Sequence, residues 1–214
     1  MPVTFLSQEL WFPPVEKANG EGLLALGGDL SPERLLLAYR SGIFPWFNED
    51  EPPLWWCPDP RFVLFPEKLY VSKSMKQLLK RKTFTVTVNQ AFEEVIHTCG
   101  RLRYDREGTW ITPSIESAYN ELHQLGYAVS VEAWQEGKLA GGLYGIRMGP
   151  FFFGESMFSK VSNASKYAFI SYVQQLQAAG VLLVDCQVYT PHLESLGAET
   201  IPRSRFLQLL KDHL

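Results

Sequence analysis

Two carboxylic acids stand among apolar residues in the C-terminal half of the chain. Glu155 lies in FFFGESMFS, residues 151–159, and Asp185 lies in VLLVDCQVY, two positions before Gln187. A buried carboxylate must be paired or hydrogen-bonded, because an isolated desolvated charge costs several kcal/mol or raises the pKa of its group. Such an acid can simply satisfy backbone amides or an arginine. Two of them beside an amide side chain favour a polar site inside an apolar cavity, where a cation is bound or a proton is moved.

The segments that hold these acids have the patterns of strands. AVSVEAW alternates, LAGGLYGIRM follows a QEGK turn, and FFFGESMFS follows a Gly149-Pro150 turn. The three segments predict an antiparallel meander. VLLVDCQVY is typical of a strand that is buried on both faces. On that strand Asp185 and Gln187 project to one face and Cys186 projects to the other.

A helix is predicted between the meander and the last strand. SNASKYAFISYVQQLQAAG has an N-cap at Ser162 or Asn163, apolar residues at helical spacing and Gly180 as its terminator. Strands, a crossover helix and one further strand form a mixed sheet with a helix against it, as in N-acetyltransferase-like (GNAT-like) folds. Such an analogy does not establish an activity.

The first part of the chain differs in texture, since residues 1–60 carry most of the 14 prolines. Ser31 as N-cap and Gly42 as a left-handed C-cap predict a helix over 32–41, and a second capped helix is predicted over 113–125. The aromatic residues after the first helix lie in proline-interrupted backbone. They favour a small core, with ligand contact as the alternative.

These patterns predict a mixed α/β (α+β) chain in two parts. We expect a small N-terminal domain over residues 1–62 and a GNAT-like domain over residues 63–214. The composition is globular, with 46% hydrophobic, 14% aromatic and 20% charged residues among 214. The chain has no apolar run of ~18 residues and no signal-peptide pattern at its start, so we expect a soluble, cytoplasmic protein.

Metal and disulfide chemistry have no support in the sequence. The three cysteines are odd in number, widely spaced and outside any CxxC pattern, which excludes a disulfide framework and indicates reduced thiols. The four histidines form no pair with metal-ligand spacing, and we therefore expect no metal site.

A basic strip lies in KSMKQLLKRK. It comprises Lys73, Lys76, Lys80, Arg81 and Lys82, with no acid among them, in a chain of net charge −3. Positions 73, 76 and 80 share one face of a predicted helix. Two interpretations stay open: a solvated helix face, or a strip that binds nucleic-acid phosphates without reading bases.

Nine blocks of sequence give the chain a family resemblance. In one order and register, it resembles the bacterial leucyl/phenylalanyl-tRNA–protein transferases over GDLSPERLLLAYRSGIFPWF, LWWCPDPR, EGTWIT, GGLYG, FFFGESMFS, NASK, DCQV, SLGAE and IPR. The resemblance implies transfer of leucine or phenylalanine, and less well methionine, from aminoacyl-tRNA to the α-amino group of proteins that begin with Arg or Lys, marking them for degradation. It implies no cofactor, because an aminoacyl ester is already activated. We expect a monomer without a membrane partner.

The resemblance also implies roles for individual residues. The catalytic pair falls on Asp185 and Gln187, whose amide holds and polarises the acid or the reacting amine. Glu155 matches the acid that orients the incoming peptide and balances its positive charge. The site of the tRNA's terminal adenosine matches Tyr39, Trp46, Trp110 and Tyr119, and the basic strip would hold the acceptor stem.

The pocket for the transferred amino acid should be large and apolar, because leucine and phenylalanine side chains have no polar group. A methionine suits a pocket that admits several shapes, and discrimination among leucine, phenylalanine and methionine should be weak. The candidates, for each of which plain core packing is the alternative, are Phe152, Phe153, Met157, Tyr172 and Leu176.

Two alternatives belong to other classes. A coenzyme-A-dependent N-acetyltransferase would have the same fold, but it usually carries a glycine-rich, pyrophosphate-binding turn before the central helix, and the junction here is SKVSNASK. A non-catalytic RNA-binding module would use the basic strip and leave the acids unexplained. The sequence does not decide whether Asp185 takes up a proton or only orients the amine.

Overall fold

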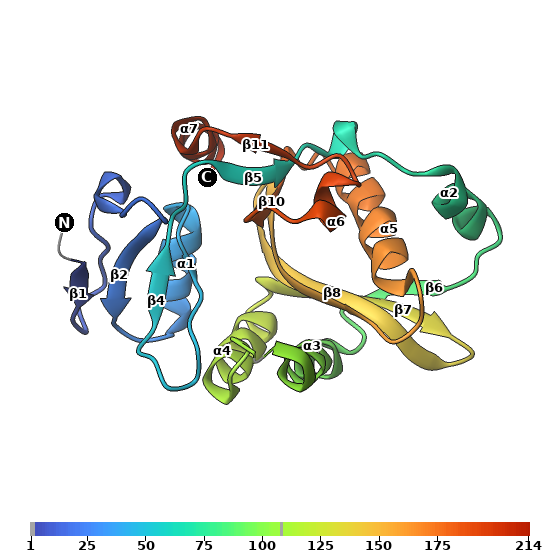
Figure 1. Cartoon of the computed structure of the whole chain (residues 1–214), viewed down its shortest axis with the longest axis horizontal. Coiled ribbons are helices and arrows are strands. Elements are labelled where there is room, and N and C mark those ends of the chain that lie inside the picture. Colours follow the sequence, from blue (N-terminus) through green and yellow to red (C-terminus); the bar gives the residue numbers. More distant parts are fainter. Residues whose placement is uncertain (1–2, 108) are drawn as a thin grey trace.

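The structure is a computed structural model that describes residues 3–107 and 109–214. Figure 1 shows a small sheet with helix α1 at one end of the molecule and a larger, twisted sheet with helices on both faces at the other. The mixed α/β class is confirmed. Among the described residues no helix is long and apolar enough to cross a membrane.

The small sheet has the strand order β1-β2-β4-β3, in which only β1 and β2 run parallel. Its strands are β1 (Thr4–Leu6), β2 (Leu23–Gly27), β3 (Phe44–Pro45) and β4 (Leu54–Trp56). Helix α1 (Pro32–Arg40) begins as predicted, because the Ser31 hydroxyl accepts a hydrogen bond from the backbone N–H of Arg34. Gly42 follows it with φ +73°, the left-handed conformation that a glycine adopts without strain. This turn sends the chain into β3 and towards Trp46.

The large sheet has the order β11-β5-β10-β9-β8-β7-β6. Its strands are β5 (Arg61–Leu64), β6 (Thr85–Val88), β7 (Ala128–Gln135), β8 (Lys138–Met148), β9 (Phe151–Ser159), β10 (Leu183–Gln187) and β11 (Glu199–Ile201). The predicted meander is confirmed as β7, β8 and β9. Strand β10 pairs parallel with β9 and antiparallel with β5, and it is buried along its whole length, as predicted.

Helices cover both faces of the large sheet (Figure 1). Besides α1, the helices are α2 (Lys73–Lys80), α3 (Phe92–Glu107), α4 (Pro113–Gln124), α5 (Ala164–Ala178), α6 (Pro191–Glu194) and α7 (Arg203–His213), with 3₁₀ turns η1 (Val15–Lys17) and η2 (Pro66–Lys68). Residues of α3 and α4 share one hydrophobic cluster with Tyr144 and Phe153, whereas α5 packs in a second cluster with Phe152 and Val184.

Helix α5 starts where it was predicted to start, but the contact that caps it differs from the prediction. Asn163 takes the N-cap position with φ +67°, and its side chain makes no capping hydrogen bond. Instead, the backbone N–H of Ser165 donates to the hydroxyl of Ser159 at 2.9 Å. A residue of β9 therefore caps the helix, because the left-handed turn brings the helix start against the end of that strand.

The division at residue 62 remains a prediction. Strand β5 starts at Arg61, so the expected boundary falls within a strand of the large sheet. One cluster of buried side chains joins Tyr39 and Trp55 of the first part to Tyr144 and Phe153 of the second.

Candidate active site

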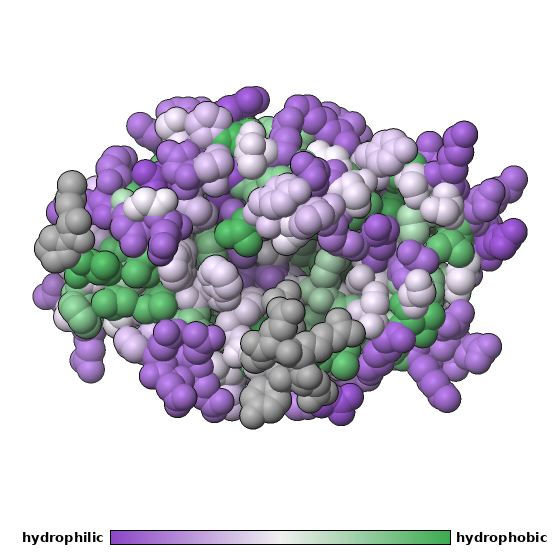
Figure 2. All heavy atoms as spheres, viewed as in Figure 1, coloured by the Kyte–Doolittle hydropathy of each residue, from purple (hydrophilic) through white to green (hydrophobic). Residues whose placement is uncertain are grey.

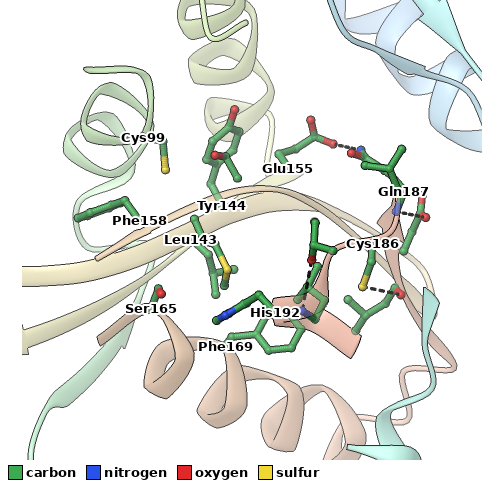
Figure 3. A pocket seen from close by; sticks show the side chains of 18 of the residues that line it. Cys99, Leu143, Tyr144, Glu155, Phe158, Ser165, Phe169, Cys186, Gln187 and His192 are labelled. Atoms are coloured by element: carbon green, nitrogen blue, oxygen red, sulfur yellow. Dashed lines mark hydrogen bonds between the residues drawn. The ribbon is translucent and has the colours of Figure 1, made fainter. Parts of the chain in front are cut away.

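A cavity of about 740 Å³ opens where β9 and β10 separate. Pairing between these parallel strands ends at Phe153 and Asp185, whereas β9 continues to Ser159. Trp46, which follows β3, and Leu193 of α6 also line this cavity. Figure 2 shows the surface hollowed near the middle of this face, and Figure 3 shows side chains from both sheet faces pointing into the cavity.

Two irregularities in the sheet aim the functional side chains. Between β8 and β9, Tyr144 is opposite Ser156 while Gly145 is opposite Gly154, so Glu155 is the extra residue of a bulge. In β10 the register against β5 shifts between Asp185 and Gln187. Bulges bend a strand and redirect the side chain at the extra position.

Glu155 is the centre of a hydrogen-bond network. Its carboxylate accepts from the hydroxyls of Tyr39 at 2.8 Å and Tyr119 at 3.1 Å, and from Nε2 of Gln187 at 2.8 Å. The two tyrosine hydroxyls also contact each other. Burial raises the pKa of Glu155 to about 7, against the lowering effect of these hydrogen bonds. The carboxyl group therefore changes charge near neutral pH.

Asp185 is held by a residue that sequence analysis did not identify. Nε and Nη2 of Arg61 donate to its two oxygens at 2.8 and 2.6 Å, and the backbone N–H of Gln187 donates to Oδ1 at 2.9 Å. The side chain of Asp185 is 0% exposed. Both oxygens of Asp185 are thus occupied by hydrogen bonds within the protein. Arg61 lies 124 positions away in the chain, and no local pattern connects the two residues.

Glu155 and Gln187 both line the cavity, and Figure 3 draws the hydrogen bond that joins them. The family model for leucyl/phenylalanyl-tRNA protein transferases matches residues 63–211, and the model for their N-terminal domain matches residues 28–59. The chain belongs to this family. The resemblance recognised in the sequence is thereby confirmed.

Named leucyl/phenylalanyl-tRNA–protein transferases are similar over nearly their full length. The protein from Flavobacterium johnsoniae is 57% identical, over 97% of this chain and 98% of its own. That from Desulfatibacillum aliphaticivorans is 56% identical, over 100% and 92%. Among solved structures, a GCN5-related N-acetyltransferase from Kribbella flavida is 13% identical, covering 80% of this chain and 61% of its own, with a TM-score of 0.41. A likeness this remote says nothing about chemistry.

Of the four residues expected at the adenosine site, two line the cavity. Trp46 is 45% exposed at its mouth, and Trp110 is partly buried. Tyr39 and Tyr119 are both 0% exposed, with their hydroxyls on Glu155. They offer no free ring face for stacking, and the geometry gives them a different task, which is to hold Glu155. The family resemblance therefore did not distinguish residues that line the cavity from residues that hold another side chain in place.

The expected amino-acid pocket is also only partly at the cavity. Phe152 and Met157 line it. Phe153 lies on the opposite face of β9 with its ring 5.1 Å from that of Tyr39. Tyr172 packs behind Phe152 at 5.1 Å. Apolar side chains that sequence analysis did not place in this pocket also line the cavity, among them Leu143, Phe169, Val184 and Leu193.

Helical spacing explains why Tyr172 and Leu176 were expected to line the cavity. Phe169 and Tyr172 lie three positions apart on the buried face of α5, and Leu176 lies one turn further on. Periodicity identifies that face but not which turn reaches the cavity. His192 also lines the cavity, and burial, with the charge of Lys166, lowers its pKa. The neutral imidazole adds to the polar groups of the lining, which also include Ser165 and Thr190.

The basic strip forms an exposed face of α2, with Met75 buried beneath it and Leu78 and Leu79 packed against the core. Figure 1 places α2 at the end of the molecule away from the small sheet. All three cysteines are buried, and Cys186 lies on the face of β10 opposite to Asp185, as predicted. Over residues 3–107 and 109–214, no group of His, Cys, Asp and Glu is arranged to hold a metal ion.

Proposed function

We propose that this chain transfers a leucyl or phenylalanyl group from aminoacyl-tRNA to the α-amino group of an acceptor protein that begins with Arg or Lys. The observation that carries the proposal is the contact between Gln187 and Glu155 at the mouth of a cavity with largely apolar walls. An uncharged side chain fits the walls, and a cationic acceptor meets the carboxylate. Membership of the transferase family supports this assignment.

The donor is placed by the cavity walls. Trp46 and Trp110 lie at the cavity from different elements, and they would stack the terminal adenosine, at about 1–3 kcal/mol per base. The leucyl or phenylalanyl side chain would then enter between Phe152, Met157 and Phe169. Apolar walls of this kind separate side chains that differ by one methylene only about 10- to 200-fold. Weak discrimination between leucine, phenylalanine and methionine follows.

The acceptor is placed by Glu155 and Gln187. The reaction needs a neutral amine, and an α-amino group with a pKa near ~8 supplies a useful fraction of it at neutral pH. Its nitrogen forms a bond to the ester carbonyl carbon, the bond from that carbon to the ribose oxygen breaks, and the proton lost by the amine ends on that oxygen. The carboxylate of Glu155 can take up this proton on the way, because its pKa is about 7. Positioning supplies much of the rest, since the ester is already activated.

Asp185 acts in this proposal through Gln187. Proton uptake by Asp185 itself would require the loss of its contacts with Arg61. We therefore assign Asp185 to holding the backbone of Gln187, and the contact with the amine to Gln187 and Glu155. The substitution Asp185→Ala is expected to abolish transfer and to leave tRNA binding intact.

The tRNA body would meet α2. The five exposed cations of the basic strip, three on α2 and two directly after it, can neutralise backbone phosphates without sequence reading. We further propose that the protein acts as a cytoplasmic monomer without a cofactor. Replacing Lys80 and Arg81 with alanine should weaken tRNA binding and flatten its dependence on salt, with an unchanged rate for a minimal aminoacyl-adenosine donor.

The assignment is tested by incubating the protein with radiolabelled leucyl-tRNA and one of two peptides, which begin with arginine or alanine and are otherwise identical. Label is expected in the arginyl peptide only. A parallel reaction with labelled acetyl-coenzyme A tests the acetyltransferase alternative. Acetyl transfer, or no transfer from leucyl-tRNA by a folded protein, would refute the proposal.

A further inference from the structure

Arg61 lies where three parts of the molecule meet. It is the first residue of β5, it is 0% exposed, and it pairs with Asp185 of the neighbouring strand β10. The ring of Phe44 from the small sheet lies 4.8 Å from its guanidinium carbon, and the ring of Phe206 from α7 lies 4.6 Å from it. The C-terminal helix therefore contacts the charged group that supports the site.

The geometry of this contact depends on a guanidinium group. Two parallel N–H···O bonds fix the plane of the Asp185 carboxylate, and a lysine has no such fork. Nη1 of Arg61 has no hydrogen-bond acceptor among the described residues. The faces of Phe44 and Phe206 supply cation–π attraction in its place. A buried pair of this kind is held in one arrangement, because loss of either partner leaves an uncompensated charge.

The pair is connected to the reacting groups by Gln187. Oδ1 of Asp185 accepts from Nε of Arg61 and also from the backbone N–H of Gln187. Gln187 has φ +63°, a left-handed conformation that a side chain larger than glycine adopts only when its surroundings hold it there. In that conformation its Nε2 reaches Glu155 at 2.8 Å.

We propose that Arg61 is a positioning residue for aminoacyl transfer: through Asp185 it fixes the left-handed backbone of Gln187, and with it the amide that meets Glu155. This inference rests on the proposed function. Arg61 does not touch the substrate. It determines where the amide of Gln187 lies, and Phe206 of α7 holds Arg61 in place.

The test compares Arg61→Lys with the wild type in steady-state transfer to an arginyl peptide. Lysine keeps the buried charge and loses the fork. We expect kcat to fall on the order of 10- to 100-fold, because lysine cannot replace both charge-assisted hydrogen bonds from Arg61 to Asp185. The KM for leucyl-tRNA should change little, because Arg61 does not touch the substrate. In a Gln187→Ala background the same substitution should have little further effect on kcat, because the two residues act in one chain of contacts.

Phe206→Leu is a second variant that leaves the Arg61–Asp185 pair intact and removes one ring face. It should lower kcat by a smaller factor, and this loss too should vanish in the Gln187→Ala background. Leu210→Val is the matched control. Leu210 is buried on the same helix and faces Gly42, so the variant should lose stability and keep the wild-type kcat.

Three results would overturn the inference while the wild type remains active: a wild-type kcat in folded Arg61→Lys, losses that multiply in the double variants, or a loss in Leu210→Val equal to that in Phe206→Leu. If Arg61→Lys does not fold, the Phe206→Leu comparison decides the question by itself. An inactive wild type would instead refute the proposed function.

Discussion

Replacing Glu155 with glutamine tests the physical account of the site directly. Glutamine keeps one oxygen, which can still accept the hydrogen bond from Tyr39, places an amide group where Tyr119 donates to the second oxygen, and removes the titrating group. The interval between 4.5, the ordinary pKa of a glutamate, and about 7 corresponds to roughly 3 kcal/mol, at about 1.36 kcal/mol per pKa unit. This is the upper limit of the free energy that the buried charge costs the folded protein at high pH.

The sign of the effect follows from the raised pKa. The folded protein binds this proton more tightly than the unfolded chain does, so the stability contributed by Glu155 is full below pH 4.5 and is lost as the pH rises through about 7. Up to about 2 kcal/mol of the loss falls between pH 5.5 and pH 8. Over this range Glu155→Gln should gain up to that amount in free energy of unfolding relative to the wild type, while it loses transfer activity.

Urea unfolding curves at pH 5.5 and pH 8 measure this difference. Glu121→Gln is a suitable control, because Glu121 is exposed on α4 and its charge remains in solvent. The reasoning is refuted if Glu155→Gln gains no stability relative to the wild type between the two pH values, or if the control gains as much.

Three further results are expected. Tyr119→Phe removes a hydrogen bond that lowers the pKa of Glu155, so the acidic limb of the pH–kcat profile should move to higher pH; an unmoved limb would contradict the role of this contact. Phe169→Ala, which enlarges the cavity, should raise phenylalanyl relative to leucyl transfer, whereas Leu176→Ala should cost about 2–5 kcal/mol of stability and leave that ratio unchanged. Trp46→Ala should raise the KM for leucyl-tRNA by about 5- to 150-fold, the equivalent of about 1–3 kcal/mol of stacking. Equal binding of leucyl-tRNA by the wild type and this variant would exclude stacking on Trp46.

Much of the secondary structure is readable from local chemistry. The Ser31 cap, the glycine after α1, and the alternation and turns of the meander are contacts between residues close in sequence, and all appear as predicted. The order of the sequence blocks likewise identified the transferase family. In the site, Glu155 and Asp185 could be singled out because carboxylates are rare in strands with such apolar neighbours, and the family resemblance added Gln187.

What the sequence determined by itself was therefore the meander, the buried strand β10, several of the helices, the family and the polar residues that matter. Only the tertiary structure decided what each of these residues touches. Arg61 reaches Asp185 across 124 positions, and the bulge at Glu155 arises from the pairing of two strands rather than from either one. The same holds for Tyr39 and Tyr119, which support the carboxylate from separate helices. Local patterns specify which face a side chain takes, whereas its partner and its depth depend on how distant segments pack, and no short-range periodicity records that.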